Sequence, residues 1–206
     1  MSSDVDICNL ALGHIGSAAE VTAIDPADAS VEAMHCARFY PAARRVLLES
    51  HAWRFATRRA ALALLSTTET PDAWGFTYTY PSECLRLLRV LTPSSSNDDT
   101  SDAFKAEVLA DGSPVIHTNA EEAVAVFTAD VTDTTLFTPL FTQALARLLA
   151  SYLAGPMLKG TSGMKVAEAQ YKIYLAEFAQ AAARDAGARN GGAYASHTPS
   201  SIGVRG

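Results

Sequence analysis

The spacing of apolar residues changes twice along this chain of 206 residues, and that change limits the folds it can adopt. At both ends apolar side chains recur at intervals of three and four, which predicts amphipathic helices. Between Trp53 and Val131 they alternate instead, which predicts β-strands. We therefore expect an α+β fold, mainly α, in which a small antiparallel β subdomain is inserted into a bundle of N-terminal and C-terminal helices.

The pattern divides the chain into four parts. N-terminal helices are expected over 1–52, the β subdomain over 53–131, C-terminal helices over 132–186 and a flexible C-terminal arm over 187–206. The arm is predicted because its glycines and its many Ser, Thr and Pro residues leave no apolar stripe to bury.

Capping residues and prolines predict where the first two helices begin and end. Ser3 or Asp4 can cap a helix over 4–15, and a second helix should begin near Ser30. Pro41 falls inside the second pattern. It should either kink that helix or occupy the first position of a new one.

The C-terminal helices have equally clear signals. Thr138 is a good N-cap and Pro139 a good first helical residue, whereas the glycine and proline at 155–156 should end that helix. The last helix is expected from about Ser162 to Ala186, followed directly by the arm.

The strands are predicted from alternation and from turn residues. The clearest is the aromatic run at 74–80, which Pro81 stops. Trp53, Trp74 and Phe76 are expected to pack between the sheet and the helices. Further strands are expected near 53–65, 85–91, 104–109, 114–118 and 123–129.

The composition disfavours several classes of protein. Sixteen Lys and Arg against 22 Asp and Glu give a net charge of −6, unlike a protein that mainly binds phosphates. No apolar run approaches the ~20 residues of a membrane helix, and the acidic start does not resemble a signal peptide. Cys8, Cys36 and Cys84 are widely spaced, which predicts free thiols in a protein made in a reducing compartment.

Charge is arranged in blocks along the chain. Residues 1–32 carry six acids and no base, and residues 38–59 carry six arginines against one acid. These blocks either cancel within one fold or meet on neighbouring copies. A nucleic-acid surface is less favoured than pairing with the acids of 1–32 or of a neighbour, because the total charge is negative. The candidates for charge contacts between subunits are Arg38, Arg45, Arg58 and Arg59.

No arrangement typical of catalysis is visible in the sequence. A phosphate-binding glycine loop and a nucleophile elbow are both missing. His14, on an apolar stripe, is predicted to be a satisfied core histidine. His35 and Cys36 are adjacent and so face different sides of a helix. The sequence therefore predicts no enzymatic activity, no cofactor and no metal site.

Two pairs of motifs follow one another in an informative order. ICNLALGHIGS at 7–17 precedes WRFA at 53–56, and YPSECLRLLRV at 80–90 precedes LFTQALARLLA at 140–150. In this order they resemble the tail tubular protein A family of tailed bacteriophages, the head-to-tail adaptor between portal and tail nozzle. The resemblance covers about residues 5–185.

The resemblance implies a structural virion protein, made in the host cytoplasm, that forms a ring, commonly of twelve copies, around the DNA ejection channel. The implied partners are further copies of this chain, the portal protein, the nozzle protein and, as a further candidate, tail fibres. Genomic DNA would pass through the lumen without sequence-specific binding, and no membrane contact is implied in the assembled state. An acidic lumen would repel DNA and let it slide.

Two further hypotheses concern binding. The C-terminal arm could hold a partner through Tyr194 and Ile202 as apolar anchors and through Arg189 and Arg205 as ligands for carboxylates. The alternative to a virion protein is a soluble binding module, encoded by a prophage or a bacterium. Such a module would use the aromatic strand at 74–80 as a platform for a ligand or a partner.

Overall fold

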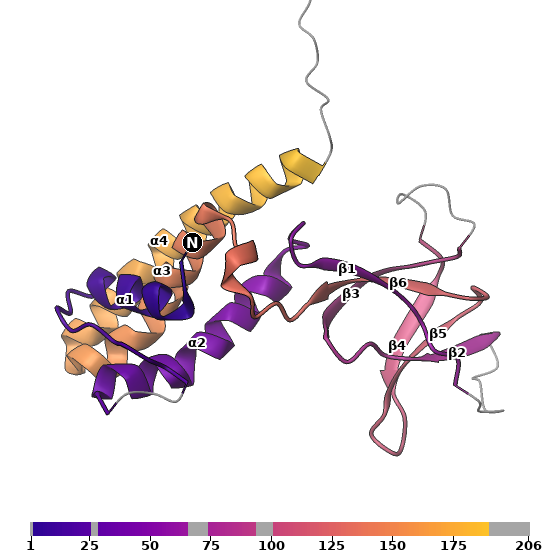
Figure 1. The fold of residues 1–206 in the computed structure, drawn as a ribbon, viewed down its shortest axis with the longest axis horizontal. Coiled ribbons are helices and arrows are strands. Elements are labelled where there is room, and N and C mark those ends of the chain that lie inside the picture. Colours follow the sequence, from indigo (N-terminus) through magenta and orange to yellow (C-terminus); the bar gives the residue numbers. More distant parts are fainter. Residues whose placement is uncertain (1, 26–28, 66–73, 94–100, 190–206) are drawn as a thin grey trace, which may run out of the picture.

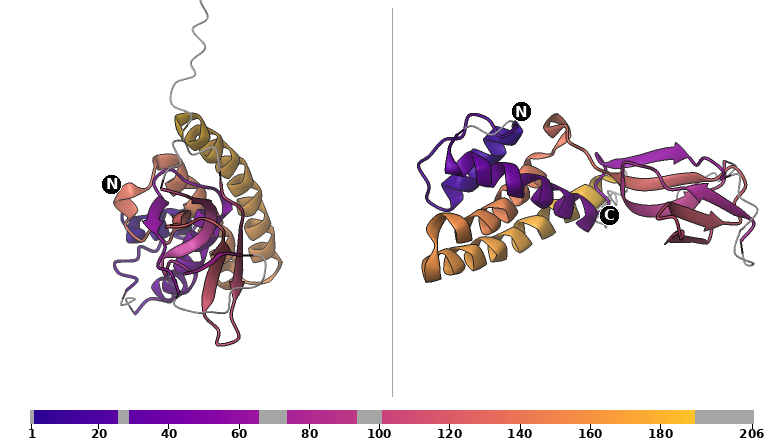
Figure 2. Two further views of the ribbon diagram at one scale, coloured as in Figure 1. Left: turned by 90° about the vertical axis from the view of Figure 1, so that its right-hand side faces the viewer. Right: turned by 90° about the horizontal axis from the view of Figure 1, so that it is seen from below.

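The computed structural model describes residues 2–25, 29–65, 74–93 and 101–189. Within these ranges the fold is mixed α+β, as the sequence predicts. The helices are α1 (Asp4–His14), α2 (Val31–Ser50), α3 (Pro139–Leu158) and α4 (Gly160–Arg189). Figure 1 shows the helices packed together at one end and the strands at the other. Seen from below in Figure 2, the β subdomain projects from the helical body along the long axis of the molecule.

The β subdomain contains two three-stranded antiparallel sheets, where the sequence predicted one. The first has the order β1 (Thr57–Ala61), β6 (Val124–Ala129), β3 (Cys84–Leu91). The second has the order β2 (Phe76–Thr79), β5 (Pro114–Thr118), β4 (Phe104–Val108). Alternation predicted the strands but not all of their partners. Both neighbours of β6, and β2 beside β5, are distant in the sequence, whereas β4 and β5 are consecutive.

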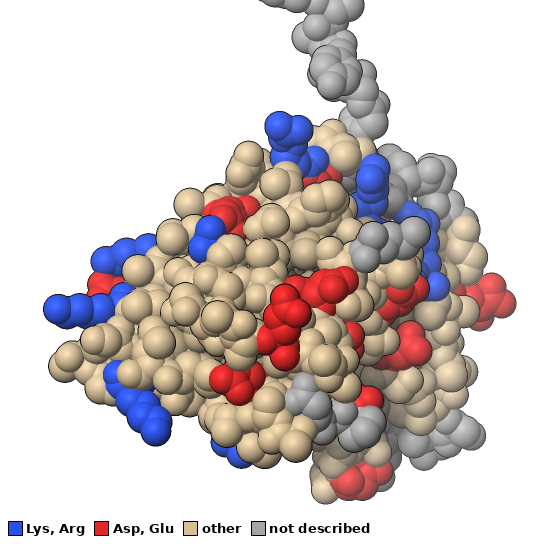
Figure 3. All heavy atoms as spheres, turned by 60° about the vertical axis from the view of Figure 1, so that its left-hand side comes forward, with Lys and Arg blue, Asp and Glu red and all other residues tan. Residues whose placement is uncertain are grey.

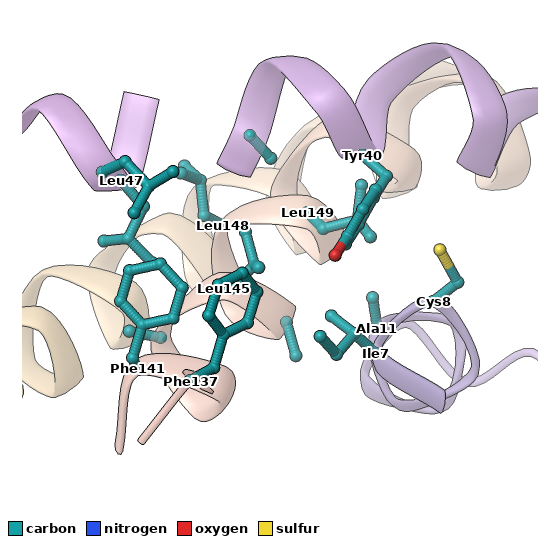
Figure 4. Packing of buried hydrophobic residues seen from close by; sticks show 14 of the residues in the cluster. Ile7, Cys8, Ala11, Tyr40, Leu47, Phe137, Phe141, Leu145, Leu148 and Leu149 are labelled. Atoms are coloured by element: carbon teal, nitrogen blue, oxygen red, sulfur yellow. The ribbon is translucent and has the colours of Figure 1, made fainter. Parts of the chain in front are cut away.

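Helix α3 lies at the centre of the main core. It is apolar on most of its circumference, which is the pattern of a helix surrounded by protein. Its neighbours in space are α1, α2 and α4. Figure 4 shows side chains of α1, α2 and α3 meeting there, together with Phe137 from the segment before α3. The labelled residues are Ile7, Cys8, Ala11, Tyr40, Leu47, Phe137, Phe141, Leu145, Leu148 and Leu149.

The predicted helix caps are confirmed. Ser3 Oγ accepts a hydrogen bond from the Asp6 N–H, and the Asp6 carboxylate accepts one from the Ser3 N–H. This reciprocal pair satisfies two backbone donors at the start of α1. Ser30 caps α2 and Thr138 caps α3, with Pro139 as the first residue of α3.

The two prolines inside helical patterns disturb the helices less than the sequence suggested. Pro41 lies within one continuous α2, so no new helix starts there. The predicted end of α3 at 155–156 is wrong, because α3 includes Pro156 and continues to Leu158. Its end is set instead by Lys159, whose backbone has φ 54° and whose N–H donates to the Gly155 carbonyl.

Helices α3 and α4 form a tight hairpin. A Cβ placed on Gly163 would lie 2.9 Å from the Ala154 carbonyl oxygen, so only glycine permits this approach. Helix α4 extends to Arg189, three residues beyond the expected end at Ala186. Arg189 is therefore the last helical residue and not part of a separate arm. Tyr194, Ile202 and Arg205 lie outside the described residues.

The predicted positions of the aromatic residues are confirmed for Trp53 and wrong for the other two. Trp53 is fully buried in the main core. Phe76 packs instead in a smaller cluster within the β subdomain that includes Tyr78 and Ile116. Trp74, two residues before Phe76, is half-buried. The sheet that carries Phe76 has its own core, because the other sheet connects the subdomain to the helices.

Candidate interaction surfaces

Two arginines of α2 bind one carboxylate at the joint between the helices and the β subdomain. Arg44 Nη2 lies 2.7 Å from Asp130 Oδ1, and Arg45 Nε lies 2.8 Å from Asp130 Oδ2. Asp130 directly follows β6, and its N–H donates to the Glu83 carbonyl. The Arg44 side chain is 9% exposed, so this ion pair is largely withdrawn from water. The pair therefore fixes the end of β6 against α2.

A second polar contact ties the end of α4 to the same joint. The Asp185 carboxylate accepts the Arg54 N–H at 3.1 and 3.2 Å and lies 3.3 Å from His51 Nε2. Between these contacts, the Trp53 indole N–H donates to the Leu47 carbonyl at 2.8 Å. The turn between α2 and β1 is thus held by α2 on one side and by α4 on the other.

These contacts correct the expected partners of the arginine-rich block. Arg45 pairs within its own chain with Asp130, and not with an acid of 1–32. Arg58 Nη1 donates to the Phe55 and Thr57 carbonyls. Arg38 on α2 and Arg59 on β1 are exposed. The sequence could not give the partners, because Asp130 and Asp185 are brought to the block only by tertiary folding.

A bulged strand gathers arginines on one face of the first sheet. Arg59 on β1 and Arg89 on β3 both pair with Val126, and Arg86 on β3 pairs with Thr128. Paired residues in antiparallel strands share a face. Arg86 and Arg89 are three residues apart and share it only because the register shifts between Leu87 and Arg89. This basic face could not be predicted from the sequence, since a bulge has no clear signal in the apolar pattern.

Helix α4 carries a row of exposed apolar side chains, which we call the α4 stripe. Met164, Tyr171 and Leu175 are 69%, 46% and 47% exposed. Their spacing of seven and four residues places them on one side of the helix. Exposed apolar rows of this kind mark interaction sites more often than isolated exposed residues do.

Acidic and basic groups are unevenly distributed over the helical side of the molecule. Figure 3 shows acidic side chains across the middle of this face and basic side chains mainly toward its margins. Opposite charges separated in this way can set the register of neighbouring molecules.

A buried histidine connects two polar residues in the second sheet. His117 is fully buried, with Nδ1 2.8 Å from Thr77 Oγ1 and Nε2 2.9 Å from Glu107 Oε1. Hydroxyl, imidazole and carboxylate in contact resemble the parts of a hydrolase triad. However, Thr77 is 2% exposed, so a substrate could not reach its hydroxyl in this conformation. The arrangement satisfies buried polar groups inside the sheet.

Glu107 makes the second sheet sensitive to acid. Hydrogen bonds from Lys105, and then from His117, hold the pKa of the Glu107 carboxyl below its usual range. A lowered pKa in the folded state stabilises the fold fully above the unfolded pKa of about 4.3, and this contribution is lost as pH falls through the folded value. We expect the thermal midpoint of Glu107→Gln to fall less steeply below pH 4.5 than that of the wild type. Equal slopes in a calorimetric pH series would contradict this assignment.

His14 is less well satisfied than the sequence suggested. Its Nε2 atom is buried and has no hydrogen-bond partner among the described residues. Burial, and then the nearby Arg147, lower the pKa of His14 below its usual value, which favours the neutral imidazole. The His14 carbonyl accepts a hydrogen bond from Gln170 of α4 at 2.8 Å. The residue thus contributes to the contact between α1 and α4.

An apolar pocket opens in the β subdomain, and we call it the β-subdomain pocket. It has a volume of about 510 Å³ and is lined mainly by Leu62, Leu64, Phe76, Tyr78 and Val124. Its charged lining residues in the described structure are Glu121 and Glu122, both exposed. Phe76 and Tyr78 belong to the aromatic strand that the sequence marked as a possible platform.

Neither a metal site nor a membrane-spanning helix is found in the described part of the chain. There, no group of three or more His, Cys, Asp or Glu side chains is arranged to hold a metal ion. Cys8 and Cys36 are buried and Cys84 is half-buried, and none of the three forms a disulfide in the described structure. None of the helices in the described ranges combines the length and apolar character needed to cross a membrane.

Comparison with known proteins adds no family assignment. No family model matches the sequence, and no curated protein matches it significantly.

Proposed function

We propose that this protein is a structural virion protein, the head-to-tail adaptor that joins the portal to the tail nozzle of a tailed bacteriophage. Copies of the chain would form a ring around the DNA ejection channel, without enzymatic activity. The proposal begins from the order of sequence motifs between 7 and 150. The observation that carries it furthest is the α4 stripe, because an adaptor ring needs a surface for neighbouring copies.

The two-part shape of the molecule supports the same function. A helical body can supply contacts between subunits, while a projecting β subdomain can reach an adjacent component along the axis (Figures 1 and 2). Ion pairs at Asp130 connect the two parts. A connection of this kind suits an adaptor, since the spacing between its two partners must be maintained.

The contacts with portal and nozzle are proposed for the basic face of the first sheet and for the residues after α4. Arg38, Arg58 and Arg59 remain candidates for charge contacts between copies, whereas Arg45 is engaged within its own chain. Tyr194, Ile202 and Arg205 remain candidates for portal contacts, with Arg189 at the base of that segment.

Electron microscopy of the purified protein mixed with its portal protein tests the proposal directly. Rings centred on the portal axis are the expected result. A protein that stays monomeric and never associates with the portal would contradict the adaptor function.

The α4 stripe gives a sharper prediction. Tyr171→Glu combined with Leu175→Glu should weaken self-association roughly thirtyfold or more, because central apolar contacts typically contribute about 2 kcal/mol or more. Mass photometry over a dilution series measures the effect. Val108→Glu, at a 66% exposed position on β4, is the matched control and should assemble normally. Equal assembly of both variants would exclude the α4 stripe as the contact.

The β-subdomain pocket supports a second candidate function, a soluble binding module. Phe76 and Tyr78 place the aromatic strand in the wall of a hollow large enough for a small apolar ligand. A monomer that binds a small molecule in this pocket with micromolar affinity would favour the module over the adaptor. Titration calorimetry with small organic cations that carry apolar groups measures this binding and distinguishes the two functions.

A further inference from the structure

The β-subdomain pocket combines an apolar wall with negative charge. Leu62, Leu64 and Val124 supply apolar surface, and Leu64 is 60% exposed. Glu121 and Glu122 supply two carboxylates and no described lining residue supplies a base. The occupant that fits is therefore an apolar segment carrying a cation.

The last residues of the sequence have this chemistry. Residues 190–206 contain one arginine, Arg205, and no acid. Ile202 and Val204 precede it at a spacing of two, so in an extended backbone they share a face while Arg205 lies on the other. We propose that the segment 202–205 occupies the β-subdomain pocket of its own chain, with Ile202 and Val204 against the apolar wall and Arg205 beside Glu121.

The length of the chain permits this contact. Asp185 is bonded to the Arg54 backbone, which fixes the end of α4 at the base of β1. The distance to be bridged has two parts. The eight residues from Arg54 to Leu62 span at most about 29 Å, and α4 from Asp185 to its end adds about 6 Å. Residues 190–202 can extend to about 43 Å, which exceeds the required ~35 Å. The segment therefore reaches its own pocket without unwinding α4.

Because the segment 202–205 and the pocket belong to one chain, the segment should bind its own pocket in preference to the pocket of a second copy. A covalent connection of this length gives an effective concentration in the millimolar range, far above the micromolar concentration of other molecules. The contact is proposed for the single copy before assembly and does not depend on the adaptor function. Portal contacts by Ile202 and Arg205 would require their release from the pocket.

Peptide binding to full-length protein tests the proposal. The probe is a fluorescein-labelled peptide of residues 196–206, and binding is measured by fluorescence anisotropy. Ile202→Asp in the full chain should vacate the pocket. We expect this variant to bind the peptide about tenfold more tightly than the wild type, in which the tethered segment competes for the pocket. This factor corresponds to an effective concentration of the tethered segment about ten times the Kd of the peptide. The control is Glu20→Lys combined with Ile202→Asp, because Glu20 is an exposed acid outside the pocket. This control should bind the peptide as tightly as Ile202→Asp alone.

Two pocket variants locate the binding site. Leu64→Asp combined with Ile202→Asp should reduce peptide affinity at least about tenfold, since an exposed residue can be changed without unfolding the core. Glu121→Lys combined with Ile202→Asp should weaken binding, and a peptide with Arg205→Glu should recover it. Equal peptide affinity for wild type and Ile202→Asp would overturn the proposal, as would the absence of binding to Ile202→Asp. Mass photometry shows whether the wild type forms dimers. If it does, and if dilution to monomers removes the difference in peptide affinity between wild type and Ile202→Asp, the segment occupies the pocket of a second copy instead.

Discussion

Replacing Trp53 by alanine is expected to lower the free energy of unfolding by about 3–5 kcal/mol. Trp53 is fully buried, and its ring centroid lies 5.0 Å from that of Phe141 and 6.1 Å from that of Phe178. Its removal would leave a cavity where α2, α3, α4 and the entry to β1 meet. It would also leave the Leu47 carbonyl without its indole donor. Urea denaturation followed by circular dichroism at 222 nm, the helical signal, measures the change.

Trp74 is the matched control, because the chain contains two tryptophans. Trp74 is half-buried and lies two residues before β2, and Trp74→Ala should cost about 1 kcal/mol. Trp53→Phe should fall between the two, since it keeps part of the ring volume but loses the hydrogen bond. Equal destabilisation by Trp53→Ala and Trp74→Ala would contradict the central position assigned to Trp53.

Replacing Asp130 by alanine is the second change with a large expected effect. It leaves the Arg44 guanidinium largely buried without its carboxylate, which typically costs about 3–5 kcal/mol. The loss should appear as a lower urea midpoint. Because the ion pair joins α2 to the end of β6, contact between the helical body and the β subdomain should weaken. Amide hydrogen exchange in 124–131 should then increase more than exchange in α3.

A double-mutant cycle separates the ion pair from other effects of the substitution. Arg44→Met added to Asp130→Ala removes the unpaired cation and should recover most of the lost stability. Arg45→Ala should cost no more than about 1 kcal/mol, because the Arg45 side chain is 61% exposed. A large effect of Arg45→Ala, with a small effect of Asp130→Ala, would show that Arg44 does not depend on this carboxylate.

The interaction surfaces were only partly predictable. The exposed arginines Arg38 and Arg59 and the aromatic strand could be named from the sequence. The α4 stripe could not, because Met164 and Leu175 fit the same apolar pattern as the buried Tyr174. Which of these side chains faces the core depends on where α3 lies against α4. The β-subdomain pocket needed β1, β2, β6 and the Glu121–Glu122 turn to be brought together.

The sequence by itself determined the elements and their order. Apolar periodicity separated helices from strands, and Ser3, Ser30 and Thr138 marked helix starts, because capping depends on residues within one turn. The tertiary structure decided what distant residues do. It paired Arg44 with Asp130, 86 residues away, and divided the strands between two sheets. It also carried α3 past Pro156, since packing on neighbouring helices outweighs one lost backbone hydrogen bond near a helix end.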